Sequence, residues 1–346
     1  MKINSFHHFR AIAIIIIIAG HSFGVTGLEV NSLSGSLVKN LIQGGTALFV
    51  FISGFLFHHI FYPKYNYGDF LEKKIKNVLV PYLLLGFAPV VMAVLMNKGW
   101  FDGYFLPTGP GFFLEFVVPM VKYYSAGTFL TAYWYIPFIM VVFITSPLHI
   151  YYIRLDIKLQ LATILLFSIM AIFIHRPVGG ILVFQSVIYY MPIYFFGITA
   201  SIHKEFIYRA FRGKEFLFLL TAVGLAFYQA SLGDVGNYQK QPFDYAGVDW
   251  MFLQKIALCL FFMIFLKRFE EFNNYWVHNV AATSFTAFFI HPFILAILIK
   301  LELTYLNMNS WVFYILFVFT VTAICVIFAK TLRKLLPKYS RYIIGY

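Results

Sequence analysis

The stretch FHHFRAIAIIIIIAGHSFG, from Phe6 to Gly24, decides the fold class of this chain. It is apolar and long enough to cross a hydrocarbon core of about 30 Å, which takes roughly 20 apolar residues. It nevertheless carries a cation, Arg10, near one end and an ionisable side chain, His21, near the other. Charged groups are costly at bilayer depth, so both residues are candidates for function.

Apolar runs of similar length recur along the whole chain. Its 346 residues are 61% hydrophobic and 12% charged, against about 25% charged in soluble domains, which indicates a polytopic membrane protein. The first run resembles a signal peptide, but nine further runs and no clear cleavage site favour a retained helix. We expect an all-α transmembrane helical bundle, a single membrane domain over 1–346, with about ten spans at 8–27, 42–62, 78–97, 131–151, 159–175, 184–202, 216–232, 250–266, 280–299 and 311–329.

The net charge of +12 is explained mainly by topology. An even number of spans with both termini inside leaves 19 of the 26 Lys and Arg residues on the inner side. This asymmetry follows the positive-inside rule and predicts cytoplasmic termini, so nucleic acid is not an expected partner, while anionic membrane lipid is a secondary one. The seven cations on the other face are Lys39, Lys98, Lys122, Arg176, Lys240, Lys255 and Lys300.

Helical geometry relates Arg10 to His21. Eleven steps of about 100° and 1.5 Å make roughly 1100°, about 20° past three full turns, over some 16 Å. Both side chains therefore lie on one face near opposite ends, although Arg10 reaching the headgroups and His21 lying in the interface is an alternative. All 14 Asp and Glu residues lie in loops or near span ends, which leaves Arg10 free for an anionic ligand. An unperturbed histidine pKa near 6.5 suits proton exchange with a hydroxyl.

Three further features suggest chemistry. Lys73, Lys74 and Lys76 form a cluster that suits phosphate, although topogenic charge explains it equally well. His291 lies in mid-span beside Pro292, where it faces either a cavity or a structural hydrogen-bond partner. The polar and aromatic connection 233–250 suits a carbohydrate-like partner or is an ordinary solvated loop.

Common catalytic motifs are absent from the sequence. No Walker, HExxH, GxSxG or dinucleotide-binding pattern occurs in a credible context. His58 and His59 are consecutive and point about 100° apart on a helix, so they do not form a metal pair. Cys259 and Cys325 fall in predicted spans without metal or disulfide spacing. We expect no metal.

Five elements, in order, resemble those of the membrane acyltransferase-3 family, the ten-helix O-acyltransferases that modify bacterial surface sugars. They are FRAIAIIIIIAGH with Arg10 and His21, LFVFISGFL (48–56), Lys73-x-x-Lys76 followed by LVPY (79–82), YWYIPFIMVVFITSPL (133–148), and the segment from Ser284 to His291 and Pro292. Lysines replace the family's paired arginines, and Ala132 and Tyr133 stand where a histidine is common. No SGNH hydrolase-like domain follows, so the chain resembles the stand-alone type.

The resemblance implies an acyltransferase that uses an acyl-CoA donor, usually acetyl-CoA, and the hydroxyl of a lipid-linked or surface glycan such as lipopolysaccharide. It also implies the cytoplasmic (inner) membrane of a bacterium. Arg10, Lys73, Lys74 and Lys76 would bind the donor, and His21 would deprotonate the acceptor hydroxyl or pass the acyl group on, with Arg10 assisting. The expected cavity-lining residues are Tyr133, Trp134, Ser284 and His291.

Two other functions stay open at this point. A glycolipid or polysaccharide transporter or flippase would move its substrate but release no CoA thiol. A scaffold of an envelope complex would tolerate the loss of Arg10 and His21.

Overall fold

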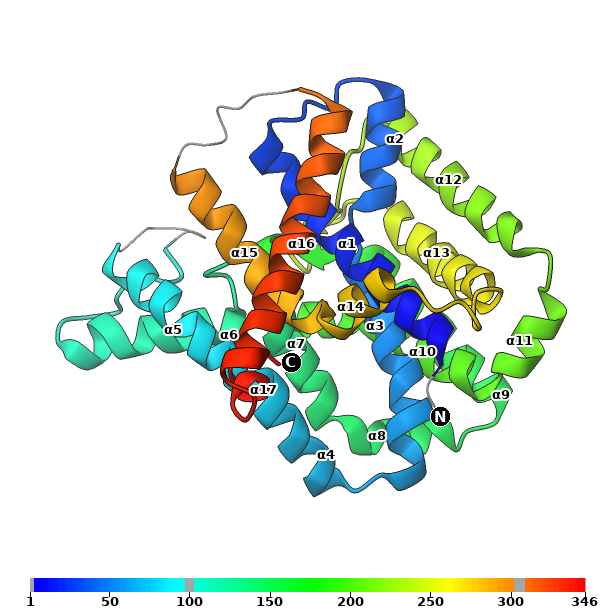
Figure 1. Ribbon diagram of the computed structural model, residues 1–346, viewed down its shortest axis with the longest axis horizontal. Helices are drawn as coiled ribbons and strands as arrows, with labels where there is room; N and C mark the ends of the chain where they lie inside the picture. Colours follow the sequence, from blue (N-terminus) through cyan, green and yellow to red (C-terminus); the bar gives the residue numbers. More distant parts are fainter. Residues whose placement is uncertain (1–2, 97–102, 302–308, 346) are drawn as a thin grey trace.

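The computed structural model describes residues 3–96, 103–301 and 309–345, and helices dominate it (Figure 1). The α-helices are α1 (Asn4–Thr26), α2 (Leu33–Ile42), α3 (Thr46–Leu56), α4 (Tyr67–Lys74), α5 (Val80–Leu95), α6 (Val118–Ala126), α7 (Tyr135–Ile144), α8 (Ser146–Ile153), α9 (Ile157–Ile174), α10 (Val183–Ile202), α11 (Lys204–Ala210), α12 (Glu215–Ser231), α13 (Trp250–Lys267), α14 (Tyr275–Ala282), α15 (Ser284–Lys300), α16 (Trp311–Leu335) and α17 (Ser340–Ile344). Short helical segments are η1 (Phe57–Phe61), η2 (Tyr62–Lys64), η3 (Ile75–Leu79), η4 (Phe113–Val117) and η5 (Val178–Gly180), and the strands are β1 (Arg176–Pro177) and β2 (Gln239–Lys240).

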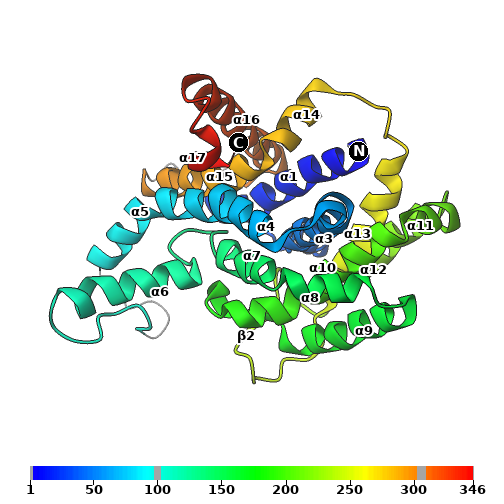
Figure 2. The same cartoon turned by 90° about the horizontal axis from the view of Figure 1, so that it is seen from below.

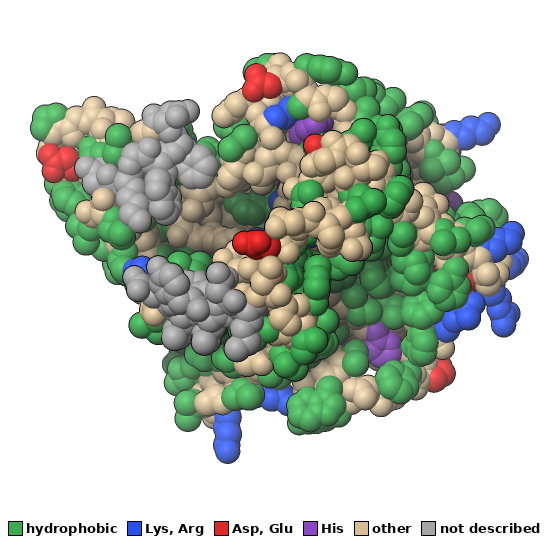
Figure 3. Space-filling view, turned by 90° about the horizontal axis from the view of Figure 1, so that it is seen from above, with side chains coloured by type: hydrophobic (Ala, Val, Ile, Leu, Met, Phe, Trp, Pro, Cys, Tyr) green, Lys and Arg blue, Asp and Glu red, His purple; other side chains and the backbone are tan. Residues whose placement is uncertain are grey.

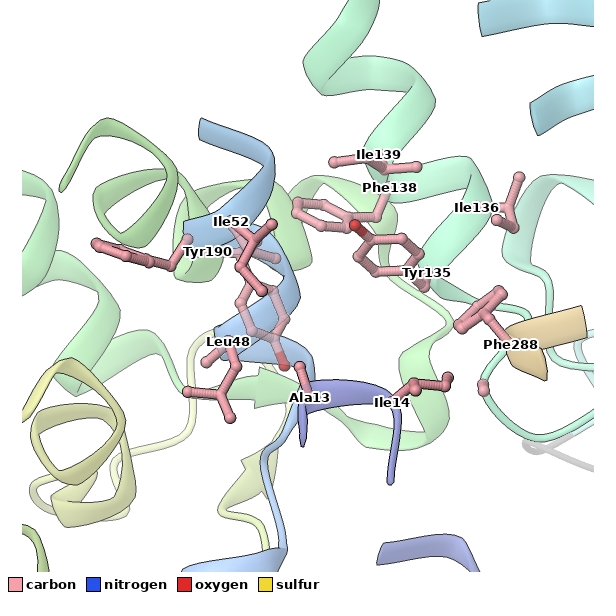
Figure 4. Packing of buried hydrophobic residues seen from close by; sticks show 14 of the residues in the cluster. Ala13, Ile14, Leu48, Ile52, Tyr135, Ile136, Phe138, Ile139, Tyr190 and Phe288 are labelled. Atoms are coloured by element: carbon pink, nitrogen blue, oxygen red, sulfur yellow. The ribbon is translucent and has the colours of Figure 1, made fainter. Parts of the chain in front are cut away.

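Helix α1 is the central element. It packs against α2, α3, α13, α14, α15 and α16, and Figures 1 and 2 both show it enclosed by other helices. Ile14 and Ile18 of the isoleucine run are fully buried. Ile14 belongs to the same buried cluster as side chains of α3, α7 and α15, some of which Figure 4 shows. The helix ends where Gly27 adopts a left-handed conformation, with φ of 62°.

Among the described residues, seven helical stretches are long and apolar enough to cross a membrane, or up to nine if each of two bent pairs is one span. The bent pairs, α7 with α8 and α14 with α15, fall on the predicted spans 131–151 and 280–299. The predicted span 216–232 falls on α12, which is shorter, at 17 residues. An all-α polytopic protein is therefore confirmed, while the count of ten spans and the cytoplasmic termini stay predictions.

The predicted span 42–62 is broken at its start. Helix α2 ends at Ile42, and α3 begins at Thr46 after Gly44, whose φ is 76°. The ammonium of Lys255, from α13, donates to the carbonyls of Asn40 (3.1 Å) and Leu41 (2.8 Å) at the end of α2. Helix ends at membrane depth must have their backbone groups satisfied from within the protein, which accounts for the burial of this lysine.

Helices α3 and α10 approach each other closely because each has a glycine at the contact. A Cβ atom on Gly54 would lie 2.0 Å from the Tyr194 carbonyl oxygen, and one on Gly197 would lie 2.2 Å from that of Phe51. Small residues let helices pack closely, and Gly54 and Gly197 have this role at the α3–α10 contact.

Two connections shape the surface near α1. The α14–α15 pair bends by 74°, which brings Ser284 to the start of a new helix. Strands β1 and β2 pair in parallel, with Arg176 opposite Gln239, and so tie the turn after α9 to the predicted polar connection 233–250. The face at the top of Figure 1, where α1 ends, is hollowed in the space-filling view of Figure 3.

Candidate functional site

A cavity of about 350 Å³ surrounds Arg10. We call it the Arg10 cavity. Four cationic side chains line it together, and none of its lining residues is acidic. Three of these cations, Arg10, Lys73 and Lys74, are predicted donor-binding residues, and the fourth, Arg341, is not. The remaining lining is mainly aromatic and aliphatic, contributed by Ile17, Thr46, Phe49, Ile52, Ser53, Leu56, Phe61, Asn77, Val78, Tyr135, Ile139, Phe143, Ser284, Phe285, Phe288 and Gly345.

Contacts with neighbouring helices hold the cations of this cavity in place. The Arg10 guanidinium donates through Nη2 to the Ser284 hydroxyl at 2.9 Å, across 274 positions of sequence. The Lys74 ammonium lies 4.2 Å from the centre of the Phe61 ring and 4.5 Å from that of Phe143. Aromatic faces attract cations without neutralising them, so the positive charge stays available to an anionic ligand.

Lys76 does not line the Arg10 cavity. Its side chain is 49% exposed and pairs with Glu72 one helical turn away. The π-helical segment η3, which begins at Ile75, follows α4 directly and changes the backbone hydrogen bonds from i→i+4 to i→i+5. Lys73 and Lys74 therefore face the cavity without Lys76.

Sequence reasoning missed Arg341. It lies on α17, a five-residue helix that packs against α5, η3 and α15. The Thr286 hydroxyl on α15 anchors this helix by donating to the Ile344 carbonyl at 3.0 Å. The only signal was one more cation among the basic residues after the last span, which the positive-inside rule already explained.

A second cavity, of about 320 Å³, lies at the other end of the same face of α1. We call it the His21 cavity. The two cavities share no lining residue. They are nevertheless close together, because Ile17 lines the Arg10 cavity and Gly20, less than one helical turn further along α1, lines the His21 cavity. The lining is rich in amides, hydroxyls and glycine, and consists of Gly20, His21, Gln43, Thr128, Leu130, Thr131, Ala132, Trp134, Arg176, Pro177, Gly179, Gly180, Asn237 and Gln239.

His21 is held by two neighbours. Its Nδ1 lies 3.0 Å from the Thr131 hydroxyl, and its ring stacks on that of His291, with centroids 5.5 Å apart. His291 is fully buried, and its Nδ1–H donates to the Ala287 carbonyl at 2.8 Å, which leaves its Nε2 as an acceptor with no partner among the described atoms. Two imidazoles thus lie side by side, and His21 lines the cavity.

The structure separates the two aromatic residues expected to bind substrate. Trp134 lines the His21 cavity and stacks on Tyr190, with centroids 5.8 Å apart. Tyr133 is fully buried, lines neither cavity and donates its hydroxyl to the Phe289 carbonyl at 3.1 Å. Tyr133 therefore joins α15 to the start of α7, whereas Trp134 is placed to touch a ligand.

The comparisons with known proteins bear on this pair of cavities. A family model described as an acyltransferase domain matches residues 3–330. The chain belongs to the acyltransferase-3 family. No curated protein and no solved structure matches the chain.

The match covers both cavities of this acyltransferase apart from α17, so Arg341 lies beyond the matched residues. Among the described residues of the acyltransferase, no group of three or more His, Cys, Asp or Glu side chains could hold a metal ion. The arrangement offers a cationic cavity suited to an anionic donor, and an imidazole in a polar cavity suited to accept a proton.

Proposed function

We propose that the protein is an integral-membrane O-acyltransferase that moves an acyl group, most simply acetyl, from acyl-CoA to a hydroxyl of a glycan. Two cavities of different character along one face of α1 carry this proposal: the cationic one around Arg10 and the polar one around His21. The acyltransferase family supports the reaction type.

The Arg10 cavity suits the donor. CoA carries a 3′-phosphate and a pyrophosphate, and the cavity offers four cations with no acidic residue. Its apolar lining suits the pantetheine arm, which would extend along α1 toward His21. Arginine contacts phosphate through two parallel hydrogen bonds, whereas lysine acts as a point charge. Arg10 and Arg341 would therefore orient the phosphates, and Lys73 and Lys74 would add attraction.

The His21 cavity suits the acceptor. When Nδ1–H of His21 donates to Thr131, Nε2 carries the lone pair and takes the proton of the acceptor hydroxyl. The acceptor oxygen then attacks the thioester carbonyl, the carbon–sulfur bond breaks, and the leaving CoA thiolate takes the proton from the His21 imidazolium, which restores the base. General-base catalysis of this kind contributes about 10² to 10⁴ in rate.

The positive-inside rule sets the proposed orientation. We place the Arg10 cavity on the cytosolic side of a bacterial cytoplasmic membrane, where acyl-CoA is made, and the His21 cavity toward the outer leaflet. A lipid-linked or exported glycan would reach His21 from that side.

A pair of assays tests this function. Purified protein with acetyl-CoA and acceptor glycan should release free CoA thiol, and His21→Ala should lower the rate at least about 10²-fold. His278→Ala is the matched control, because His278 is exposed on α14. In cells, the O-acyl NMR signals of envelope polysaccharide should be lost on gene deletion and restored by the wild type but not by His21→Ala.

Several outcomes would count against this function. A flippase would move glycolipid with no thiol released. A scaffold would leave both assays unaffected by His21→Ala. If deletion left every O-acyl signal intact, the surface-glycan acceptor would be wrong.

A further inference from the structure

The His21 cavity contains a buried cation for which the proposed function has no use, Arg176. Its side chain is 7% exposed, and its backbone is fixed in β1, where its N–H donates to the Tyr238 carbonyl at 3.3 Å. The guanidinium carbon lies 5.3 Å from the centre of the Trp134 ring and 5.8 Å from that of Tyr190. Arg176 is therefore a rigid part of the cavity wall and not a mobile surface group.

Within the described part of the chain, Arg176 makes no direct ion pair, although Asp249 acts on it electrostatically. None of the ion pairs there includes it, and its Nη1 is buried without a hydrogen-bond partner. The Asp249 carboxylate is near enough to interact electrostatically, but it already accepts hydrogen bonds from Tyr189 (2.8 Å) and the Phe252 N–H (2.9 Å). A buried cationic group with an unmet hydrogen-bond donor is costly, so a ligand anion that accepted from Nη1 would complete this site.

The rest of the wall is suited to a sugar. Thr128 Oγ1 and Asn237 Oδ1 are also buried without hydrogen-bond partners, and no acidic residue lines the cavity. Gln43 and Asn237 are held in place, because Gln43 Oε1 accepts from Asn237 Nδ2 at 2.9 Å and Gln43 Nε2 donates to the Gly20 carbonyl at 2.8 Å. A cavity of about 320 Å³ with few fixed polar groups is typical of a small-ligand site.

We propose that the acceptor is an acidic sugar, and that Arg176 binds its carboxylate or phosphate group while His21 faces the hydroxyl to be acylated. This proposal rests on the proposed function, because it names the acceptor class for the same cavity. Carboxylate and phosphate both match the planar fork of a guanidinium. Three test ligands distinguish them: methyl glucuronide, glucose 6-phosphate and the neutral methyl glucoside.

Binding is measured first, by calorimetry on the full-length protein in nanodiscs without acyl-CoA. We expect at least one acidic ligand to bind wild type about 10- to 100-fold more tightly than methyl glucoside, which corresponds to the loss of a charge-assisted hydrogen bond. Arg176→Gln should abolish this preference, and Arg176→Lys should keep part of it. Arg154→Gln, at an exposed arginine of the α8–α9 connection, should retain the preference.

Turnover is measured second, as thiol release from acetyl-CoA with the same ligands. The ratio of kcat/KM for the acidic over the neutral acceptor should fall toward one in Arg176→Gln, chiefly through KM. If wild type showed no preference for either acidic ligand, the proposal would be wrong. It would also be wrong if Arg176→Gln weakened both kinds of acceptor equally while its unfolding temperature was unchanged.

The two measurements separate this inference from the proposed function. Selective binding of an acidic sugar without thiol release would leave Arg176 as an anion site and refute acyl transfer. Thiol release with equal use of both acceptors would leave acyl transfer intact and refute the acidic acceptor. If Arg176→Gln failed to fold, the comparison of wild type with Arg176→Lys across the three ligands would still decide the matter.

Discussion

At the scale of single residues, the contact between Arg10 and Ser284 organises the Arg10 cavity. The Ser284 hydroxyl accepts from Nη2 at 2.9 Å and so leaves the other face of the guanidinium for a ligand. A hydrogen bond to a charged group is worth about 1.5 to 3 kcal/mol. Ser284 would therefore be a positioning residue, which affects donor binding by orienting the Arg10 guanidinium.

Replacing this hydroxyl tests its role. Ser284→Ala should raise KM for acetyl-CoA about tenfold or more with a smaller change in kcat, because the guanidinium loses its orienting partner. Ser231→Ala, at the exposed end of α12, is the matched control. In a double-mutant cycle with Arg10→Lys the two effects should not add, since both remove one interaction. Full additivity would show that Ser284 acts independently of Arg10.

The sequence predicted the positions of some site residues but not the contacts or positions of others. Arg10 and His21 could be related to one another because they share a helix, whose period fixes which face each occupies. Ser284 could be named, but not its contact with Arg10, since that contact depends on how α15 meets α1. Arg176 and Arg341 were counted only as charges in the sequence. Arg176 reaches its cavity from the non-helical turn after α9, and Arg341 from the short terminal helix α17, so helical periodicity could not place either one.

At the scale of elements, helices α3 and α10 approach each other closely at Gly54 and Gly197. Gly54 and Gly197 each face a backbone carbonyl of the other helix, so neither position has room for a side chain. Helix α3 contributes Ser53 to the Arg10 cavity, and α10 supports Trp134 through Tyr190. A shift between these helices would therefore disturb both cavities.

A single methyl group probes this contact. Gly54→Ala would place Cβ 2.0 Å from the Tyr194 carbonyl oxygen, a backbone atom that cannot rotate away. We expect a loss of about 1 to 3 kcal/mol in stability, or more, seen as a lower unfolding temperature in detergent. Gly224→Ala on α12 has no atom within 4 Å and should be neutral or slightly stabilising. Equal unfolding temperatures for both variants would contradict the packing argument.

Hydropathy located the helices well and their breaks poorly. Every predicted span falls on a helix or a bent pair, because burial in a membrane demands a long apolar run. The break before α3 depends on Lys255, more than 200 residues further along the chain, and could not be seen in the local pattern.

At the scale of the whole molecule, the proposed orientation places the two cavities on opposite sides of the membrane. The positive-inside rule predicts that the α11–α12 connection is cytoplasmic and that the connection before α13 is outside. Both are accessible in the structure, since Tyr245 is 86% exposed and Arg212 is also exposed.

Labelling of intact cells tests this orientation. An impermeant maleimide should modify Tyr245→Cys and leave Arg212→Cys unmodified until the cells are broken. The natural Cys259 and Cys325 are fully buried and should give little background. Labelling of Arg212→Cys in intact cells would indicate the opposite topology, with the Arg10 cavity on the outside.

The bend at Thr283 has an electrostatic consequence. It makes Ser284 and Phe285 the first residues of α15 and sets them in the wall of the Arg10 cavity. Aligned peptide dipoles give a helix N-terminus the equivalent of about half a positive charge. This partial charge belongs to the backbone, so neither pH nor side-chain substitution removes it. The cavity would therefore keep part of its attraction for anions even without its arginines and lysines.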